Sequence, residues 1–368
     1  MKKLICFILC LISLIPAVYA DSVRIIDNGE EAYQVRMKLI ESAKEEIQIS
    51  YFIFAEDATA MEVLALLRKK AREGVKIKVM IDDMFNKIPA DVGAHLTHEN
   101  VIIKNFNKFN VLRFGKSIRY RMHDKMFIVD HQKIILGGRN IEDTYFGKAK
   151  KNYDDRDIYV AGDLAREASQ YFNQLWNADH LTNFVMKKLK EDKGAETLDL
   201  AESKYLLKAA ETSFSMSSWE GELVEVERVE LFHDEIASKK TKMTGTAAKL
   251  YDLIRKAKKS VYIDSPYLVM TKELKSLLKE VIARGIKVRI LTNSLHSTDA
   301  LFPQAAYIGQ KKRWFEWGLN CTSTTLRKVF MQNRWWLMKK SRQLEALTLI
   351  HAHKTSTPKL WRWFLTRK

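Results

Sequence analysis

The spacing of apolar and polar positions predicts alternating helices and strands over most of the chain. Residues 41–84 read as helix, strand, helix, strand, and both strands are short apolar runs. Residues 251–293 repeat this order. In each half the second strand follows a glycine, Gly74 or Gly285, as expected for a left-handed cap at the end of the preceding helix. The pattern predicts a mixed α/β layer fold with two similar domains.

Length and composition fit two domains of ordinary size. The chain has 368 residues, 46% of them hydrophobic, which is enough for two sizeable cores. The predicted segments are a signal peptide at residues 1–20, a first domain at 21–200, an incomplete second domain at 201–312 and a basic, Trp-rich tail at 313–368.

The N-terminal segment has the three parts of a secretory signal. Two lysines precede an apolar run from Leu4 to Val18, and small residues end at Ala20. We expect cleavage after Ala20 and export to the periplasm or the medium, where the protein would meet a membrane surface. The alternative is an uncleaved anchor, but the run is shorter than the roughly 20 apolar residues that a membrane-spanning helix needs.

Cysteine and histidine spacing indicates no metal site. Cys6 and Cys10 lie in the predicted signal, so the mature chain would keep Cys321 alone and could form no internal disulfide. The histidines show no H-E-x-x-H or similar spacing. We therefore expect neither a metal nor another cofactor.

One segment carries candidate chemistry. Residues 123–130 read H-D-K-M-F-I-V-D, and G-G-R-N follows at 137–140. His123 and Lys125 are two residues apart on a predicted strand, so their side chains would share one face and could meet one phosphate group. Asp130 would lie in the turn after the strand. Gly138 would let the backbone approach a ligand closely, and Asn140 would add an amide donor.

The full spacing H-x-K-x4-D, with G-G-x-N following, resembles the phospholipase D superfamily. The continuation G-G-R-N-I-E-D-T-Y-F-G at residues 137–147 is similar to its bacterial cardiolipin-synthase-like branch. Members of this family pack two similar α/β domains so that one motif from each faces a single site. The serine usual after the first glycine is Gly138 here, so one hydroxyl that could assist a phosphate contact is missing.

The resemblance implies a phosphoryl transfer. His123 would attack phosphorus to form a phosphohistidine, and a histidine of the second motif would protonate the leaving alcohol. Lys125 and Asn140 would stabilise the equatorial phosphate oxygens, with Gly138 beside them, and Asp130 would support the geometry of the motif. The implied substrate is a glycerophospholipid such as phosphatidylglycerol.

The composition of the chain changes at about Arg313. From this residue to the end lie six of the eight tryptophans and +10 of the net charge of +17. Residues 21–312 carry only +5, which argues against a nucleic-acid substrate because backbone binding depends on phosphate neutralisation. Taken at face value, the tail suits a basic membrane helix or a nucleic-acid patch.

The genetic code suggests another origin for the tail. If each codon from Phe330 to His353 is started at its third base, the permitted bases spell H-A-K-S-M-V-V-D-E-K-V-A-A-I-G-S-F-N-V-D-P-R-S. Met and Trp have single codons, so several letters are forced, such as Val from Trp335 and Trp336. We interpret the tail as displaced in frame near residue 313. The family's second motif would then be lost, and residues 313–368 would not form the native strands and helices.

Three functions remain open from the sequence. The leading one is a phospholipase D-like phosphodiesterase or phosphatidyltransferase that needs the second motif for full activity. The second is an inactive remnant that at most binds phospholipid or another protein. The third is an endonuclease-like homodimer in which two copies of His123 meet.

Overall fold

The structure is a computed structural model that describes most of the first half and the centre of the second. The described residues are 21–108, 121–179, 181–184, 193–233, 245–266, 270–294, the short pieces 308–309 and 316, and five strands within 320–366. The predicted signal peptide at residues 1–20 lies outside them. In the described part of the chain, no helix combines the length and the apolar composition needed to cross a membrane.

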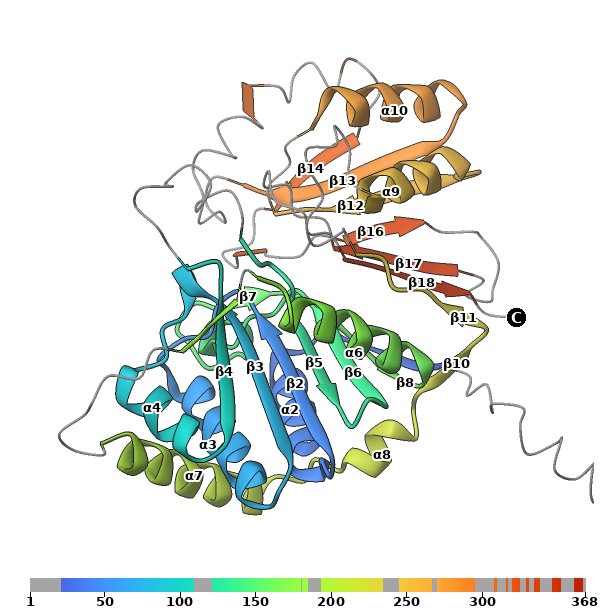
Figure 1. Cartoon of the computed structure of the whole chain (residues 1–368). Helices are drawn as coiled ribbons and strands as arrows, with labels where there is room; N and C mark the ends of the chain where they lie inside the picture. The colour runs from blue at the N-terminus through green and yellow to red at the C-terminus, as the bar shows by residue number, and fades with distance from the viewer. Residues whose placement is uncertain are drawn as a thin grey trace, which may run out of the picture.

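The first half is built on a nine-stranded sheet (Figure 1). The strands, in the order in which they lie side by side, are β10 (Val224–Val226), β1 (Asp21–Ile26), β8 (Asp157–Ala161), β6 (Lys133–Gly137), β5 (Met126–Val129), β2 (Glu46–Tyr51), β3 (Lys76–Asp82), β4 (Val101–Phe106) and β9 (Leu181–Asn183). The strands β2, β3 and β4 are parallel, and all other neighbours in this sheet are antiparallel.

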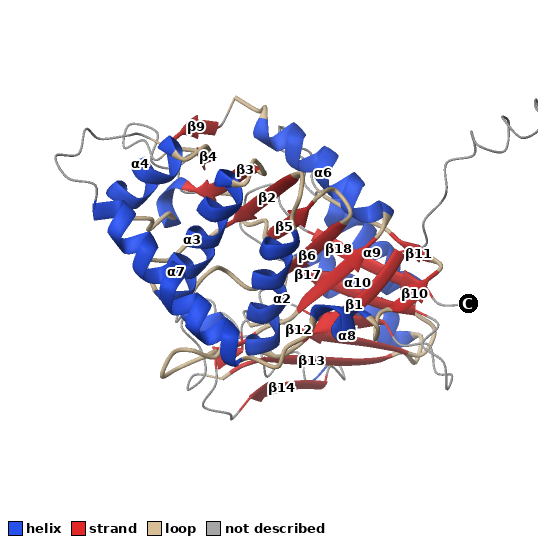
Figure 2. Cartoon of the chain, turned by 90° about the horizontal axis from the view of Figure 1, so that it is seen from below, coloured by secondary structure: helices blue, strands red, loops and turns tan. Residues whose placement is uncertain are grey.

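Helices cover both faces of this sheet (Figure 2). One face carries α2 (Gly29–Ser42), α3 (Ala58–Arg72), α4 (Ala90–His98) and α7 (Lys193–Glu211), and the other carries α6 (Asp163–Trp176). Short elements complete this half: η1 (Asp83–Phe85), η3 (Asp143–Tyr145), β7 (Tyr153–Asp154) and α8 (Met216–Glu220).

The period-two pattern of the strands explains the two layers. Ile47 and Ile49 of β2 are fully buried in the core beneath α2 and α3, whereas Met126 and Ile128 of β5 are buried beneath α6. Successive strand residues face opposite sides, so a sheet covered on both faces needs apolar residues at nearly every position. The apolar runs of β5 (M-F-I-V) and β6 (I-I-L) satisfy this need, whereas β2 alternates its isoleucines with the buried polar residues Gln48 and Ser50.

The second half repeats the centre of the first, as predicted. Its described elements are α9 (Gly245–Lys256), β12 (Ser260–Asp264), α10 (Lys272–Ala283), β13 (Lys287–Asn293), β14 (Asn320–Thr324) and β16 (Arg334–Leu337). The sheet order is β14, β13, β12, β16, with β16 antiparallel to β12 and the other pairs parallel. The strands β4, β3, β2 and β5 have the same order and directions.

Part of the expectation about the tail was wrong. Residues 313–368 were predicted not to pack as a native unit of strand and helix and to leave the second sheet short, but β14 and β16 extend this sheet. Two further tail strands, β17 (Ala346–His351) and β18 (Trp361–Thr366), pair with each other and with β11 (Arg228–Val229), and β15 (Val329–Phe330) pairs with β7. Sheet edges offer unpaired backbone groups that any extended segment can use, so pairing alone does not require a native side-chain pattern.

Candidate active site

The candidate site lies where the parallel strands of the first sheet end. Strand β5 runs antiparallel to β2 with Met126 opposite Ser50, so residues just before β5 lie beside the carboxyl ends of β2 and β3. In open α/β sheets this end commonly carries the ligand site. His123 and Lys125 precede β5 directly. They were predicted to lie within the strand and instead lie immediately before it.

The two motif side chains contact each other although neither lies within the strand. The Nζ atom of Lys125 lies 3.0 Å from Nδ1 of His123 and 3.1 Å from the carbonyl oxygen of the same residue. When Lys125 is an ammonium ion it donates to Nδ1, so the charge of the lysine and the tautomer of the imidazole are linked.

An aromatic stack borders the histidine. The ring of Phe52, which follows β2, lies 4.5 Å from the imidazole of His123 at an angle of 39°. On its other side Phe52 contacts Phe85 of η1, with 4.3 Å between ring centroids. Lys125 Nζ lies 5.5 Å from the centroid of Phe52. The same ring therefore lies beside both candidate side chains of the motif.

Burial and neighbouring charges set the ionisation of Lys125. The residue is only 4% exposed, and burial lowers the pKa of its amine to about 7, although the charges of Asp155, Asp124 and Asp157 act in the opposite direction. Burial also raises the pKa of the Asp155 carboxyl to about 7, against the nearby charge of Arg139. A lysine and a carboxyl that both titrate near neutrality are typical of functional sites.

Asp155 also explains the glycine at position 138. A Cβ atom on Gly138 would lie 2.1 Å from Oδ1 of Asp155, closer than any real contact. The carboxyl of Asp155 therefore fills the space that a serine side chain would need. The predicted contact of Gly138 with a phosphate stays a prediction.

Both polar atoms of the Asn140 side-chain amide form hydrogen bonds. Its Oδ1 accepts a hydrogen bond of 3.1 Å from the backbone N–H of Ile53, and its Nδ2 donates to the hydroxyl of Tyr145 at 2.9 Å. These contacts tie the segment after β2 to the G-G-R-N segment. The role of Asn140 as a donor to phosphate remains a prediction.

Asp130 lies at the opposite end of β5 from His123. Its carboxylate accepts hydrogen bonds of 2.8 to 3.0 Å from the backbone N–H groups of Lys44, Glu45 and Glu46, and its own φ is +51°. It thus fixes the turn and the start of β2. The structure separates it from the His123–Lys125 pair, which agrees with a supporting role and not with direct chemistry.

Sequence reasoning missed several residues that border the pair. Phe52 and Asp155 are not among the residues predicted for the site. Asp82 ends a strand, and the sequence alone leaves open whether it lines the site or is only a turn acid. It accepts from the backbone N–H of Met84 in η1 at 3.2 Å, and it also binds Arg121. The sequence signal that points to Asp82 is its position as an acid at the end of a buried strand.

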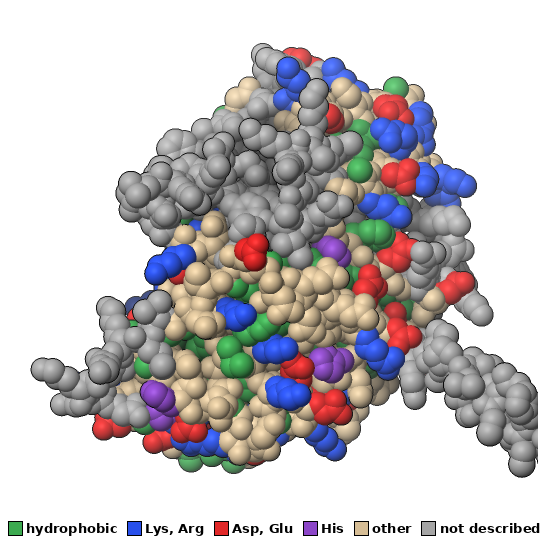
Figure 3. Space-filling view, viewed as in Figure 1, with side chains coloured by type: hydrophobic (Ala, Val, Ile, Leu, Met, Phe, Trp, Pro, Cys, Tyr) green, Lys and Arg blue, Asp and Glu red, His purple; other side chains and the backbone are tan. Residues whose placement is uncertain are grey.

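No metal cluster accompanies the site within the described residues. These residues hold no group of three or more His, Cys, Asp or Glu side chains arranged for a metal ion. On the face shown in Figure 3, the described Lys and Arg side chains are interspersed with Asp and Glu. This mixed surface agrees with the modest charge of residues 21–312.

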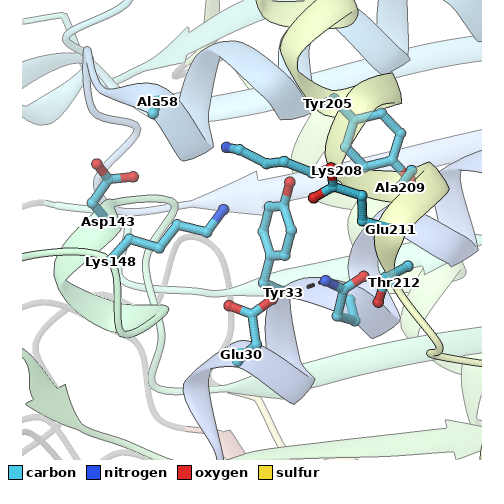
Figure 4. A pocket seen from close by; sticks show the side chains of 11 residues that line it. Glu30, Tyr33, Ala58, Asp143, Lys148, Tyr205, Lys208, Ala209, Glu211 and Thr212 are labelled. Atoms are coloured by element: carbon cyan, nitrogen blue, oxygen red, sulfur yellow. Dashed lines mark hydrogen bonds between the residues drawn. The ribbon is translucent and has the colours of Figure 1, made fainter.

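A cavity of about 540 Å³ lies elsewhere, between α2, α7 and the start of α3 (Figure 4). Beside it the buried carboxylate of Glu62 binds the Tyr33 hydroxyl at 2.7 Å, Lys208 Nζ at 2.5 Å and Lys148 Nζ at 3.3 Å. Neither His123 nor Lys125 lines this cavity. The lysines that reach it are engaged by Glu62, so we assign it no part in the chemistry.

Comparisons with known proteins agree with this site. Residues 37–176 match the family described as "Cardiolipin synthase, PLD-like domain". An uncharacterized protein of Helicobacter pylori is 26% identical over 330 residues, which cover 80% of this chain and 64% of that protein. Cardiolipin synthase C of Escherichia coli is 25% identical over 320 residues, which cover 80% of this chain and 67% of that protein. The chain thus spans less than two thirds of the length of the first of these relatives.

Solved structures share the fold. Phosphatidylserine synthase of Haemophilus influenzae superposes with a TM-score of 0.66 at 12% sequence identity, covering 94% of this chain and 84% of that chain. Polyphosphate kinase from Porphyromonas gingivalis gives a TM-score of 0.53 at 11% identity, covering 94% of this chain and 47% of that chain. At these identities the likeness concerns the fold alone, and it extends over both halves.

Proposed function

Because the chain belongs to the phospholipase D superfamily, in its cardiolipin-synthase-like branch, we propose that it transfers or hydrolyses phosphatidyl groups of glycerophospholipids. The observation that carries this proposal is the contact between His123 and the buried Lys125 at the carboxyl ends of the parallel strands. A nucleophilic imidazole beside a cation is the arrangement that attack on a phosphodiester requires.

The proposed reaction has two steps. Nε2 of His123 attacks phosphorus, the P–N bond forms, and the P–O bond to the leaving alcohol breaks while that alcohol takes a proton from a general acid, which is the histidine of the second motif in a two-motif chain and solvent in this one. Water or a second alcohol then attacks phosphorus and returns a proton to that acid, the P–N bond breaks, and His123 is regenerated. Lys125 offsets charge on the equatorial oxygens. Water as acceptor gives phosphatidic acid, and a phospholipid alcohol gives a cardiolipin-like lipid.

The strand registers support the proposal that the tail is displaced in frame. In the first half Val129 of β5 lies opposite Ile47 of β2, and in the second half Leu337 of β16 lies opposite Val261 of β12. Strand β16 therefore takes the place of β5. His123 lies three residues before β5, and Met331 lies three residues before β16.

The displaced frame spells the second motif at these same offsets. Its His codon takes its last two bases from Met331, its Lys codon from Asn333 and its Asp codon from Met338. Counted from β16, these positions correspond to His123, Lys125 and Asp130 counted from β5. We propose that the gene encodes, or once encoded, a second motif here, and that the reading frame of the present chain lacks it.

The predicted export signal would bring this activity to a membrane surface outside the cytoplasm. Asp21, the first residue after the proposed cleavage site, pairs with Val226 of β10, and its Oδ1 accepts from the backbone N–H of Leu164 at 3.1 Å. A mature chain that starts here would keep its first strand intact. Mass spectrometry of the exported protein should give Asp21 as the N-terminal residue.

The test of function compares lipid and DNA as substrates. The protein and its His123→Ala variant are assayed for diester cleavage on phosphatidylglycerol vesicles and on single-stranded DNA, with His98→Ala at the end of α4 as a control. Cleavage of lipid that is lost only in His123→Ala supports the proposal. Cleavage of DNA would favour the endonuclease-like homodimer, and no cleavage of either substrate would favour the inactive remnant.

A further inference from the structure

Two separate contact paths lead from one buried carboxylate to His123. Asp82, the last residue of β3, is fully buried, and neither its position nor its partners belong to the H-x-K-x4-D motif. We propose that Asp82 and Arg121 form a latch that positions the imidazole of His123 for attack. This inference rests on the proposed function, because it assigns a purpose to the orientation of His123.

The first path runs through the backbone that leads to the histidine. Arg121 donates from Nε to the Asp82 carboxylate at 2.8 and 3.0 Å, and its Nη2 also contacts this carboxylate. The backbone N–H of Met122, the residue before His123, donates to Oδ2 of Asp82 at 2.7 Å. The two residues before the nucleophile are thus bound to the end of β3.

Arg121 also binds the segment that follows the next strand, β4. Its Nη1 donates at 3.1 Å to the carbonyl oxygen of Asn107, which follows β4. Arg121 is only 6% exposed, so its charge needs a partner in the protein, and Asp82 provides it. The guanidinium of Arg121 donates in fixed directions to a carboxylate and to a carbonyl. It therefore restrains the backbone at residue 121 more rigidly than a lysine ammonium would.

The second path runs through aromatic rings. Asp82 caps η1 by accepting from the backbone N–H of Met84, and the next residue is Phe85. Phe85 contacts Phe52, and Phe52 contacts the imidazole of His123. The carboxylate therefore fixes both the backbone before His123 and the ring that lies beside it. Holding a nucleophile from two sides is what a near-attack geometry requires.

The decisive variant is Asp82→Asn, which keeps the shape of the side chain and removes its charge. We expect kcat on a soluble phosphodiester to fall by about 10- to 100-fold while KM changes by less than about threefold, since a misplaced nucleophile costs the chemical step more than it costs binding. Arg121→Lys should retain more activity than Arg121→Gln, because the lysine keeps the charge.

The matched control is Glu62→Gln. Glu62 is also a buried carboxylate with basic partners, but those partners are Lys148 and Lys208 beside the helices, away from His123. Both variants should lower the melting temperature, whereas only Asp82→Asn should lower kcat per folded molecule. If the two variants lose kcat equally, or if Asp82→Asn keeps full kcat, the latch is wrong and the pair only stabilises the fold.

A second readout separates this inference from the proposed function. The imidazole resonances of His123, assigned with His123→Ala, are followed by NMR as a function of pH. Asp82→Asn should shift the chemical shifts and the titration midpoint of His123, and Glu62→Gln should leave both unchanged. If Asp82→Asn shifts the His123 resonances although the wild-type protein shows no turnover, the latch is kept and the proposed function is overturned. An unchanged His123 in Asp82→Asn would overturn the latch whatever the activity.

Discussion

Arg36 of α2 and Asp157 of β8 form an ion pair in the fully buried interior of the first domain, with 2.8 Å between Nη2 and Oδ2. Arg139 of the G-G-R-N segment contacts the same carboxylate at 3.2 Å. One carboxylate thus balances two buried guanidinium groups, and both Asp157 and Arg139 lie next to groups of the candidate site.

Asp157→Asn should therefore destabilise the protein strongly. Removal of the carboxylate leaves Arg36 and Arg139 buried without their shared counter-charge, and we expect the free energy of unfolding to fall by about 3–5 kcal/mol. Urea denaturation followed by circular dichroism measures the change. The control is Asp163→Asn, which breaks an exposed pair with Arg166 and should cost less than about 1 kcal/mol. Equal losses in both variants would contradict the assigned role of Asp157.

The catalytic efficiency should decline as the pH rises through neutrality. Lys125 must be an ammonium ion to hold phosphate, and burial lowers its pKa to about 7, so kcat/KM for a soluble diester should fall above this pH. Asp155→Asn removes a charge that raises the pKa of Lys125, so the decline should begin at lower pH. Asp154→Asn, one residue earlier, should leave the midpoint unchanged. A flat profile up to pH about 9, near the ordinary range of lysine, would exclude Lys125 as the titrating group.

Gly138→Ser should destabilise the site because Asp155 already occupies the space for a side chain. We expect a loss of about 1–3 kcal/mol, as for other overpacked positions, and recovery of at least half of it when Asp155→Ala is added. Thermal unfolding of the single and double variants measures this coupling. The control is Gly245→Ser, where a Cβ would meet no atom within 4 Å. Purely additive losses would show that Asp155 and residue 138 do not compete for space.

The sequence predicted the parts of the fold that depend on local pattern. The runs that became β2, β3, β12 and β13 are interior strands in which buried apolar residues recur at alternate positions, so their signal is strong. The closeness of His123 and Lys125 is also local, since they are two residues apart, although the strand predicted for them begins only at Met126. Both predictions use information that is close in the chain.

The remaining features depend on register between distant segments. Asp155 reaches Gly138 because the β6–β8 pairing sets Gly137 opposite Asp157, and Asp82 reaches Arg121 across 39 residues of sequence. No local pattern encodes such contacts. The tail strands could not be predicted either, because edge pairing uses backbone groups that every residue type shares.

Restoring the reading frame near residue 313 should increase activity. The proposed displaced frame would place a histidine at the position in the second half that corresponds to His123, and this group could protonate the leaving alcohol. Loss of one general acid costs roughly 10²- to 10⁴-fold, so a corrected gene should yield at least about a 100-fold higher turnover of phosphatidylglycerol than the present chain.

Sequencing the gene from the codon of Ala300 past the stop comes before this assay. If the base count places the second motif in frame, the natural protein is the two-motif form. If the count confirms the present frame, the corrected gene becomes an engineered variant. His123→Ala in the corrected background is the control and should abolish the gain, because a general acid cannot act without the nucleophile. Equal turnover of the present and corrected chains would mean that the second half supplies no acid to His123, and the homodimer would then be the arrangement to test.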